Sequence, residues 1–208
     1  MLSISLNNLG KKFNREWVFR KLNFQINTGD KIVILGGNGS GKSTLLQVIS
    51  GFVSPNEGEI IYSNNETKME DEKIKDSISF ASPYLQLTED FTTFELIEHI
   101  RIFKPFINNL SSNELLQILE LSHAKDKFIK QFSSGMKQRL KLGLAILSDV
   151  PVLLLDEPVS NLDKQAIEWY KNMIRSYANK KTVIVCSNAI SEEYTFCNKE
   201  LTVTDLKP

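Results

Sequence analysis

A glycine-rich loop between two apolar segments places the strongest constraint on how this chain folds. Residues 36–43 read Gly-Gly-Asn-Gly-Ser-Gly-Lys-Ser, which matches the pattern G-x-x-x-x-G-K-[ST]. The apolar run 31–35 predicts a buried strand before the loop, and the spacing of Leu45, Leu46 and Ile49 predicts a helix after it. Glycines let successive backbone N–H groups approach phosphate oxygens, and a helix N-terminus adds the positive end of its dipole. The sequence therefore predicts a site for nucleotide phosphates.

An acidic motif later in the chain fits the same chemistry. The apolar run 152–155 predicts a buried strand that ends in Asp156 and Glu157. We expect Asp156 to lie near Mg²⁺ and Glu157 to orient or deprotonate an attacking water. In the glycine loop, we expect Lys42 to bridge the β- and γ-phosphates and the Ser43 hydroxyl to bind Mg²⁺. Taken alone, the acidic pair could also be a solvated strand end.

The pattern of apolar residues predicts an α/β fold. Alternating or compact apolar runs predict strands at residues 2–6, 22–26, 31–35, 59–62, 77–81, 152–155 and 182–186. Helical spacing dominates between residues 92 and 147, with Ser111, Ser112 and Ser133 as candidate N-caps, and a further helix is expected over 164–178.

These patterns divide one domain of 208 residues into a core and an insert. We expect an α/β core over residues 1–87 and 149–208 and a helical subdomain over 88–148. The polar segment 64–76 is expected to be a surface excursion.

Composition narrows the choice of partners and compartment. The 25 Lys and Arg residues balance the 25 Asp and Glu residues, so we expect no nucleic-acid partner. Cys186 and Cys197 are too far apart for a CxxC motif and read as thiols of a reducing compartment. Residues 1–8 carry no secretion signal, and no apolar run reaches the roughly 18–20 residues that span a bilayer. We expect a cytosolic protein whose membrane role comes through a partner.

Further segments resemble one family in particular. Residues 131–139, Gln-Phe-Ser-Ser-Gly-Met-Lys-Gln-Arg, resemble the signature motif L-S-G-G-Q-x-Q-R of ABC (ATP-binding cassette) proteins, and residues 160–163 resemble the family's D-loop. Phe13 lies where the family carries an aromatic residue that stacks on adenine, and residues 53–58 resemble the stretch after the glycine-loop helix. In the family's order, the resemblance to an ABC transporter ATP-binding subunit covers nearly the whole chain.

The resemblance implies a P-loop NTPase core, with a mostly parallel sheet and an N-terminal antiparallel portion. It implies ATP and Mg²⁺ as cofactors, with Ser43 and Asp156 on the metal. The residues it assigns to the nucleotide are Phe13, Gly36, Gly37, Asn38, Gly39, Ser40, Gly41, Lys42, Ser43, Thr44, Ser133, Ser134, Gly135 and Asp163.

The family's architecture also implies partners. Two ATP-binding subunits, here most simply a homodimer, pack head to tail with each ATP between the glycine loop of one and the signature motif of the other. An integral membrane permease would contact residues 83–106 and hold the chain at the inner face of the cytoplasmic membrane. Candidates for that contact, each with a place in the helical core as its alternative, are Phe91, Phe94, Phe103 and Phe106.

The chain departs from the family at positions that bear on hydrolysis. Asn188 stands where the family has a histidine near the γ-phosphate, and an amide carries no charge and cannot shuttle a proton. Pro83 aligns with the Q-loop glutamine, with Gln86 as its possible substitute or a solvated loop residue. In the signature, Ser134 and Met136 replace glycine and glutamine. We expect Glu157 and Asn188 as catalytic residues, with slow but real turnover.

Other functions remain open on the sequence. A GTPase or small-molecule kinase is disfavoured because residues 198–201, Asn-Lys-Glu-Leu, lack the aspartate of an NKxD motif. A non-transport ABC protein generally resembles tandem cassettes or carries long coiled coils. A weakly hydrolysing regulatory subunit is favoured by Asn188 and Pro83, and ATPase activity separates it from a transporter engine. The cargo and the direction of transport are not encoded here.

Overall fold

The computed structural model describes residues 2–203, apart from the side chains of residues 71 and 72. Its residues pack as two compact units. The first unit contains the described residues up to Phe80, then Val150–Glu157, then the described residues from Lys180 onward. The second contains Ala81–Asp149 and Pro158–Asn179. It includes the segment expected as a helical subdomain and adds residues 158–179.

The first unit begins with an antiparallel sheet. Its strands are β1 (Leu2–Phe13), β2 (Glu16–Ile26), β4 (Glu57–Asn64) and β5 (Thr67–Lys68), in the order β2-β1-β4-β5. Every second side chain at the start of β1 is buried, as the alternation of apolar residues requires. Segment 64–76, expected as a surface excursion, contains β5 and the short helix α2 (Asp71–Asp76).

A second sheet in this unit carries the loops of interest. It contains β3 (Lys31–Leu35), β6 (Ile78–Ala81), β7 (Val152–Asp156), β8 (Thr182–Ser187) and β9 (Lys199–Thr202), in the order β6-β7-β8-β3-β9. Strand β3 pairs parallel with β8 and β9, and β7 pairs parallel with β8. All residues of β7 and β8 are buried, which explains their continuous apolar sequences. Strand β9 was not predicted, because it is polar and short.

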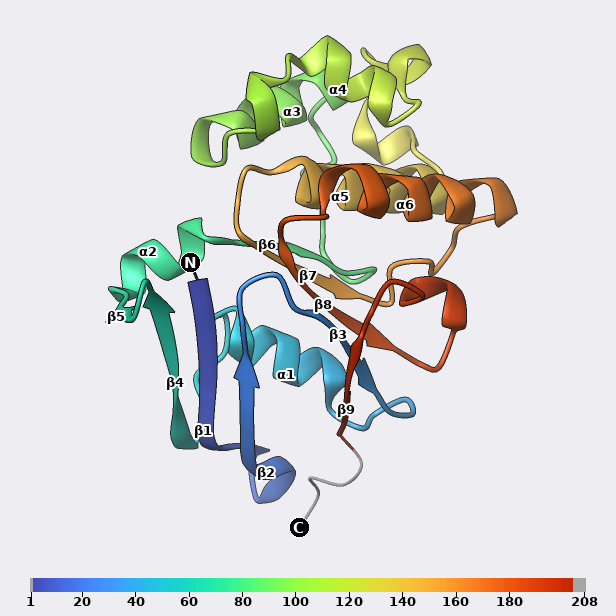
Figure 1. Ribbon diagram of the computed structural model, residues 1–208. Helices are drawn as coiled ribbons and strands as arrows, with labels where there is room; N and C mark the ends of the chain where they lie inside the picture. The colour runs from blue at the N-terminus through green and yellow to red at the C-terminus, as the bar shows by residue number, and fades with distance from the viewer. Residues whose placement is uncertain (1, 204–208) are drawn as a thin grey trace. The chain divides into compact units, whose positions relative to one another are not determined.

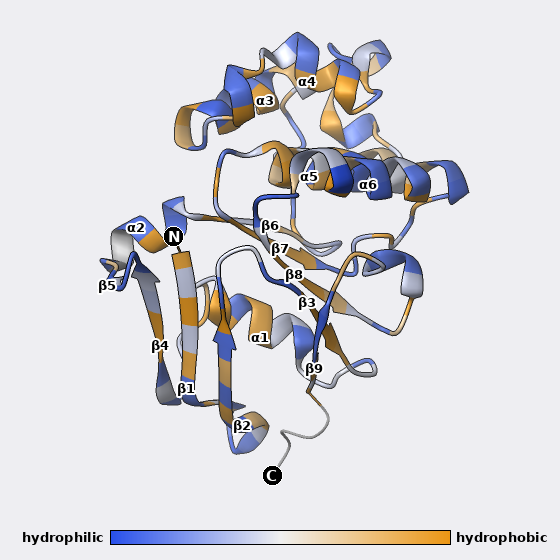
Figure 2. Cartoon of the chain, in the orientation of Figure 1, coloured by the Kyte–Doolittle hydropathy of each residue, from blue (hydrophilic) through white to orange (hydrophobic). Residues whose placement is uncertain are grey.

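Helix α1 (Lys42–Ile49) packs against β7 and β8 (Figure 1). Leu45, Leu46 and Ile49 are buried in the core of this unit together with residues from both sheets. Figure 2 shows hydrophobic stretches along α1 and β7. The expected fold class, an α/β core with an N-terminal antiparallel sheet and a parallel sheet, is confirmed.

The second unit is helical. It contains α3 (Thr93–Phe103), α4 (Ser112–Ile118), α5 (Ser134–Leu147) and α6 (Lys164–Tyr177), with short 3₁₀ turns at Ile107–Asn109, Ser122–Ala124 and Ile129–Gln131. Helix α6, expected in the α/β core, packs against α5 in this unit. Its buried Trp169 donates a hydrogen bond to the Ile118 carbonyl (3.0 Å). Within residues 2–203, no helix combines the length and the hydropathy needed to cross a bilayer.

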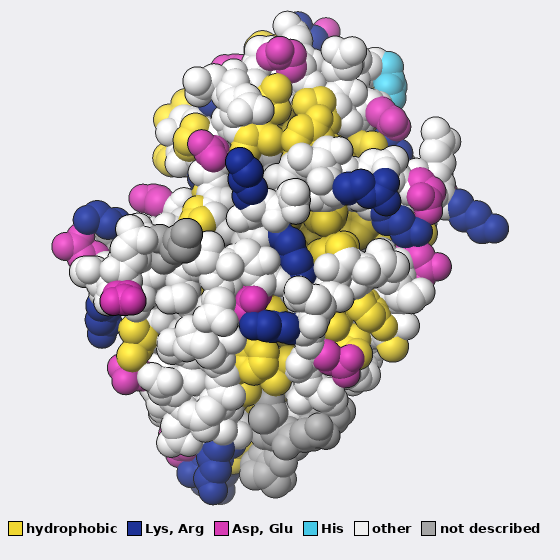
Figure 3. Space-filling view, in the orientation of Figure 1, with side chains coloured by type: hydrophobic (Ala, Val, Ile, Leu, Met, Phe, Trp, Pro, Cys, Tyr) yellow, Lys and Arg dark blue, Asp and Glu magenta, His cyan; other side chains and the backbone are white. Residues whose placement is uncertain are grey.

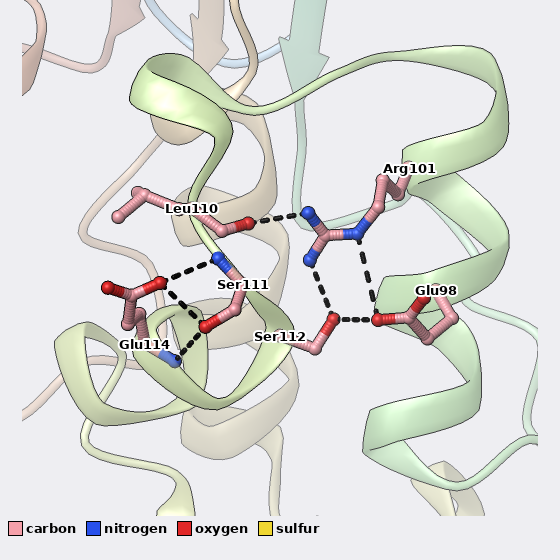
Figure 4. Close-up of polar contacts among 6 residues, drawn as sticks. All are labelled: Glu98, Arg101, Leu110, Ser111, Ser112 and Glu114. Atoms are coloured by element: carbon pink, nitrogen blue, oxygen red, sulfur yellow. Dashed lines mark hydrogen bonds and ion pairs between the residues drawn. The ribbon is translucent and has the colours of Figure 1, made fainter.

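The N-terminus of α4 is fixed by a capping residue in its sequence (Figure 4). Ser111 is the N-cap, and it forms a capping box with Glu114. The prediction that Ser112 is a cap is wrong, because Ser112 is the first helical residue. Its hydroxyl accepts a hydrogen bond from Arg101 (2.7 Å) and donates one to Glu98. This polar group joins α3 to α4.

Candidate nucleotide-binding site

The glycine loop between β3 and α1 has a backbone that only glycine tolerates at a key position. Gly41, the N-cap of α1, has φ 106°, and an added Cβ would lie 2.3 Å from Val18 Cγ1. An added Cβ on Gly36 would lie 2.5 Å from Ser40 Oγ. Ser40 is buried, and within residues 2–203 its Oγ has no hydrogen-bond partner. A cradle without Cβ atoms beside an unpaired hydroxyl fits a phosphate group.

The exposed tip of this loop carries the other predicted phosphate-binding residues. Gly37, Asn38 and Gly39 are exposed, and Gly37 O accepts the Ser40 backbone N–H (3.2 Å). Ser43 and Thr44 are half-buried in the first turn of α1. The structure thus places every predicted residue of the loop on one contiguous turn that opens a helix.

Lys42 folds back over the loop rather than pointing to solvent. Its side chain is only 4% exposed. The ammonium donates hydrogen bonds to Gly36 O (2.7 Å), Gly37 O (3.0 Å) and Asn188 Oδ1 (2.5 Å). An ammonium has three hydrogens, so all its donors are in use.

Three adjacent parallel strands, β7, β8 and β3, bring the glycine loop, Glu157 and Asn188 to one edge of the sheet. In register, Leu35 of β3 faces Ser187 of β8, and Asp156 of β7 faces Cys186 of β8. The segments that follow these strands therefore open side by side at the carboxyl edge of the sheet (Figure 1). Ligands of open α/β sheets bind in this position.

Glu157 turns the chain sharply after β7. Its φ is 44°, a left-handed conformation that non-glycine residues seldom adopt. Its backbone N–H donates to Cys186 O (3.0 Å), and its Oε1 accepts a hydrogen bond from Asn188 Nδ2 (2.7 Å). Such backbone strain, at a cost of about 1–3 kcal/mol, is concentrated at functional sites. The geometry brings Glu157 together with Asn188.

Charges converge on the buried thiol of Cys186. Burial, followed by the negative charge of Asp156, raises the pKa of Cys186 well above its usual value. The charges of Lys42 and Glu157 also act on it, with opposite signs. The raised pKa keeps the thiol protonated. A redox or nucleophilic role for Cys186 has no support here, since the thiol is fully buried.

The residues present fit Mg²⁺ held partly by a nucleotide. Asp156 is 1% exposed and contributes a carboxylate, and Ser43 contributes a hydroxyl. Mg²⁺ prefers oxygen ligands and usually binds one or two carboxylates together with substrate phosphates. Within the described residues, no cluster of three or more His, Cys, Asp or Glu side chains could hold a metal without such help.

Phe13 lies at the rim of a pocket in the same unit. Its ring is 52% exposed at the end of β1. The pocket, of about 580 Å³, is lined by Phe13, Asn14, Arg15, Glu16, Trp17, Val18 and Gly39. Trp17 was not among the residues predicted for the site, because no motif in the sequence marks it. The pocket joins Phe13 to the glycine loop through Gly39.

The signature and D-loop segments meet in the second unit. Ser133 caps α5 by accepting from Met136 N (3.2 Å), and Asp163 caps α6 by accepting from Ala166 N (2.8 Å). A pocket of about 370 Å³ includes Ser133, Gly135 and Asp163 in its lining. Ser134 is exposed at the first position of α5. Asp163 was expected to contact the nucleotide, and its observed contact is the helix cap.

Lys141 anchors the segment where a Q-loop glutamine was expected. Its ammonium donates to the carbonyls of Pro83 (2.7 Å) and Ser82 (3.4 Å). Burial lowers the pKa of Lys141 below its usual value, with a contribution from the charge of Lys137. Gln86 is exposed in the same loop.

Of the phenylalanines expected at a partner surface, Phe103 is 68% exposed, whereas Phe106 is buried and does not fit that role.

Comparison with known proteins finds relatives over most of the chain. The family model for ABC transporters matches residues 19–160. The chain is 29% identical over 188 residues to the cytochrome c biogenesis ATP-binding export protein CcmA of Reclinomonas americana, covering 89% of this chain and 84% of that protein. It is 31% identical over 184 residues to the sulfate/thiosulfate import ATP-binding protein CysA of Pectobacterium atrosepticum, covering 83% of this chain but only 55% of that protein.

A solved structure has the same fold. The dimeric structure of MJ0796, a bacterial ABC transporter cassette, matches with a TM-score of 0.80 and 26% identity, over 97% of this chain and 95% of that one. With its glycine loop, acidic strand end and fold, the chain belongs to the ABC transporter family, as an ATP-binding and ATP-hydrolysing subunit.

Proposed function

We propose that the chain powers a membrane transporter by hydrolysing ATP at the carboxyl edge of β3, β7 and β8. The observation that carries this proposal is the connected polar group at that edge, in which Asn188 joins Lys42 to Glu157. The loop backbone and Lys42 bind the phosphates, and the Phe13 ring stacks on the base. Bound Mg²⁺, held by Ser43 and Asp156, would neutralise phosphate charge.

Glu157 is the group that activates water in this proposal. Its carboxylate is held by Asn188, which fixes its direction without adding a positive charge. A positioned carboxylate next to the γ-phosphate orients a water for in-line attack and accepts its proton. Lys42 stabilises the charge that develops on the transferred phosphoryl group. Because Asn188 supplies neither charge nor proton, we expect slower turnover than a histidine would support.

Nucleotide binding can be tested apart from catalysis. Titration of the chain with AMP-PNP and Mg²⁺ should give saturable binding, which Lys42→Ala weakens by more than tenfold. Lys130→Ala, a change on the surface of the second unit, serves as the matched control and should bind as the wild type does. Equal binding by Lys42→Ala and the wild type would remove the glycine loop from the site.

The proposed ATP-hydrolysing assembly is a head-to-tail homodimer of this chain. The exposed start of α5 carries the Ser134 hydroxyl and the backbone N–H groups of a helix N-terminus, which suit the γ-phosphate on a second copy. The dimeric state of the MJ0796 cassette supports this arrangement. Glu157→Gln with saturating ATP should elute as a dimer on size exclusion and as a monomer without nucleotide. A monomer under both conditions counts against this arrangement.

A membrane permease is the proposed partner that holds the chain at the cytoplasmic face of a membrane. Figure 3 shows hydrophobic side chains at the surface in the upper part of the view. Exposed apolar residues of the second unit include Tyr84, Ile102 and Phe103, at 78%, 78% and 68% exposure. Affinity capture from solubilised membranes should recover an integral membrane protein with the wild type, and less of it with Phe103→Ser.

A regulatory subunit with little hydrolysis is the second candidate. It is favoured by Asn188 at the position where the family has histidine, and by Pro83 in place of glutamine. Such a subunit would bind AMP-PNP as tightly as a hydrolysing subunit does, but the wild type would show no steady-state ATPase activity above that of Glu157→Gln.

A further inference from the structure

The Asn188 side chain accepts a hydrogen bond from Lys42 and donates one to Glu157. These two contacts affect the relative affinity of the site for different nucleotides. The amide lies in the turn after β8, where the Ser187 hydroxyl accepts the backbone N–H of Ile190 (3.1 Å). Ala189 has φ 65°, so the chain bends immediately after Asn188. This turn aims the Asn188 side chain back at the glycine loop.

The orientation of the amide is set by chemistry. The Lys42 ammonium can only donate hydrogen bonds, so it contacts Asn188 Oδ1. The Glu157 carboxylate oxygen accepts a hydrogen bond, so it contacts Asn188 Nδ2. A flipped amide would put a donor against a donor and an acceptor against an acceptor. Asn188 therefore holds Lys42 and Glu157 at once.

The contact with Lys42 has a consequence for ligands. Gly36 O, Gly37 O and Asn188 Oδ1 together occupy all three ammonium hydrogens. An incoming phosphate oxygen must displace one of them. The two carbonyls belong to the backbone of the glycine loop itself, whereas the Asn188 side chain can turn away by rotation about its own bonds. The Asn188 contact is therefore the one that a phosphate replaces.

The lost contact is recovered only when a γ-phosphate is present. The Asn188 amide has two Nδ2 hydrogens, and among the described residues only Glu157 accepts one of them. The second hydrogen can be donated to a γ-phosphate oxygen while the contact with Glu157 is kept. A nucleoside diphosphate has no γ-phosphate oxygen. Its binding therefore breaks the contact between Lys42 and Asn188, and Asn188 forms no new hydrogen bond in exchange.

We propose that Asn188 is a specificity-determining residue that competes with nucleotide phosphates for Lys42 and thereby disfavours ADP relative to ATP. This inference rests on the proposed nucleotide site and adds to it a means of releasing product. A hydrogen bond to a charged group has a net strength that corresponds to about a tenfold change in affinity, or about 1.4 kcal/mol.

The test is the ratio of two dissociation constants. Calorimetric titration with ADP and with AMP-PNP, both with Mg²⁺, is compared for the wild type, Asn188→Ala and Asn188→Leu. Both variants remove the competitor, and the leucine keeps its approximate volume. We expect ADP to bind about tenfold more tightly to both variants, while AMP-PNP affinity stays the same or falls. Asn198→Ala, an exposed position, should leave both constants unchanged.

The outcomes separate this inference from the proposed function. If ADP binds the variants no more tightly than the wild type, or if both nucleotides tighten equally, Asn188 is not a specificity determinant. If the wild type binds neither nucleotide, the proposed function itself fails. Thermal unfolding of each variant confirms that it is folded, and the leucine variant provides the second measurement if the alanine variant is not.

Discussion

The left-handed backbone of Glu157 yields a prediction about stability that is independent of any ligand. Its φ of 44° is costly for glutamate, and the strain is retained when glutamine replaces it because the side chain has nearly the same shape. Asparagine tolerates this region better than other non-glycine residues. Glu157→Asn should therefore be more stable than Glu157→Gln.

One contact complicates a direct comparison, and a background variant removes it. The longer glutamine can keep the hydrogen bond from Asn188 Nδ2 (2.7 Å), whereas asparagine cannot reach it. We therefore place both substitutions in an Asn188→Ala background, where neither has that partner. The expected advantage of asparagine is about 1 kcal/mol, at the low end of the cost of a left-handed non-glycine residue.

Thermal unfolding followed by circular dichroism measures this difference. For a chain of this length, about 1 kcal/mol corresponds to about 2–4 °C in Tm. Glu168 in α6 is the matched control, because an exposed helical position should favour glutamine over asparagine by a few tenths of a kcal/mol. Equal Tm values for the two Glu157 variants, or a more stable glutamine variant, would refute the reasoning from strain.

Three further predictions concern other parts of the chain. Gly143→Ala puts a Cβ 1.9 Å from Leu119 Cδ2 and should cost about 1–3 kcal/mol of unfolding free energy; combined with Leu119→Ala, the loss measured in urea should be smaller than the sum of the single losses. Hydrogen bonds from the Ser111 side chain and backbone lower the pKa of Glu114 below its usual 4.5. Their contribution to stability is therefore present above pH 4.5 and is lost as the pH falls through the lowered pKa. Glu114→Gln should reduce the change in stability between pH 5 and pH 3, as measured in acid titrations followed by circular dichroism. Phe13→Ala should weaken AMP-PNP binding by about tenfold, as expected for loss of one stacking contact, and an unchanged affinity in calorimetry would remove Phe13 from the base site.

Much of the fold could be predicted because its strongest patterns are local. The buried strands β7 and β8 are continuous apolar runs, and β1 begins with regular alternation, so both types follow from burial. Strand β9 escaped prediction because its pairing with β3 comes from tertiary contact, not from its own polar sequence. Helix α6 was recognised, but its packing partner α5 could not be read from periodicity.

The site was foreseen as a set of motifs and not as a connected group. The glycine loop and the acidic strand end have fixed local spacing, which made Lys42, Asp156 and Glu157 readable. Nothing in that spacing shows that Asn188 joins Lys42 to Glu157, because this contact depends on the parallel register of β7, β8 and β3. Likewise, the role of Lys141 at Pro83 is a contact between segments far apart in sequence.

The central claim is that Glu157 activates water for ATP hydrolysis at this site. The direct test is the steady-state ATPase rate of the purified chain with saturating ATP and Mg²⁺, for the wild type, Glu157→Gln and the surface control Glu168→Gln. We expect a slow but measurable rate for the wild type and Glu168→Gln, and a rate at least a hundredfold lower for Glu157→Gln. Equal rates for the wild type and Glu157→Gln would contradict the account.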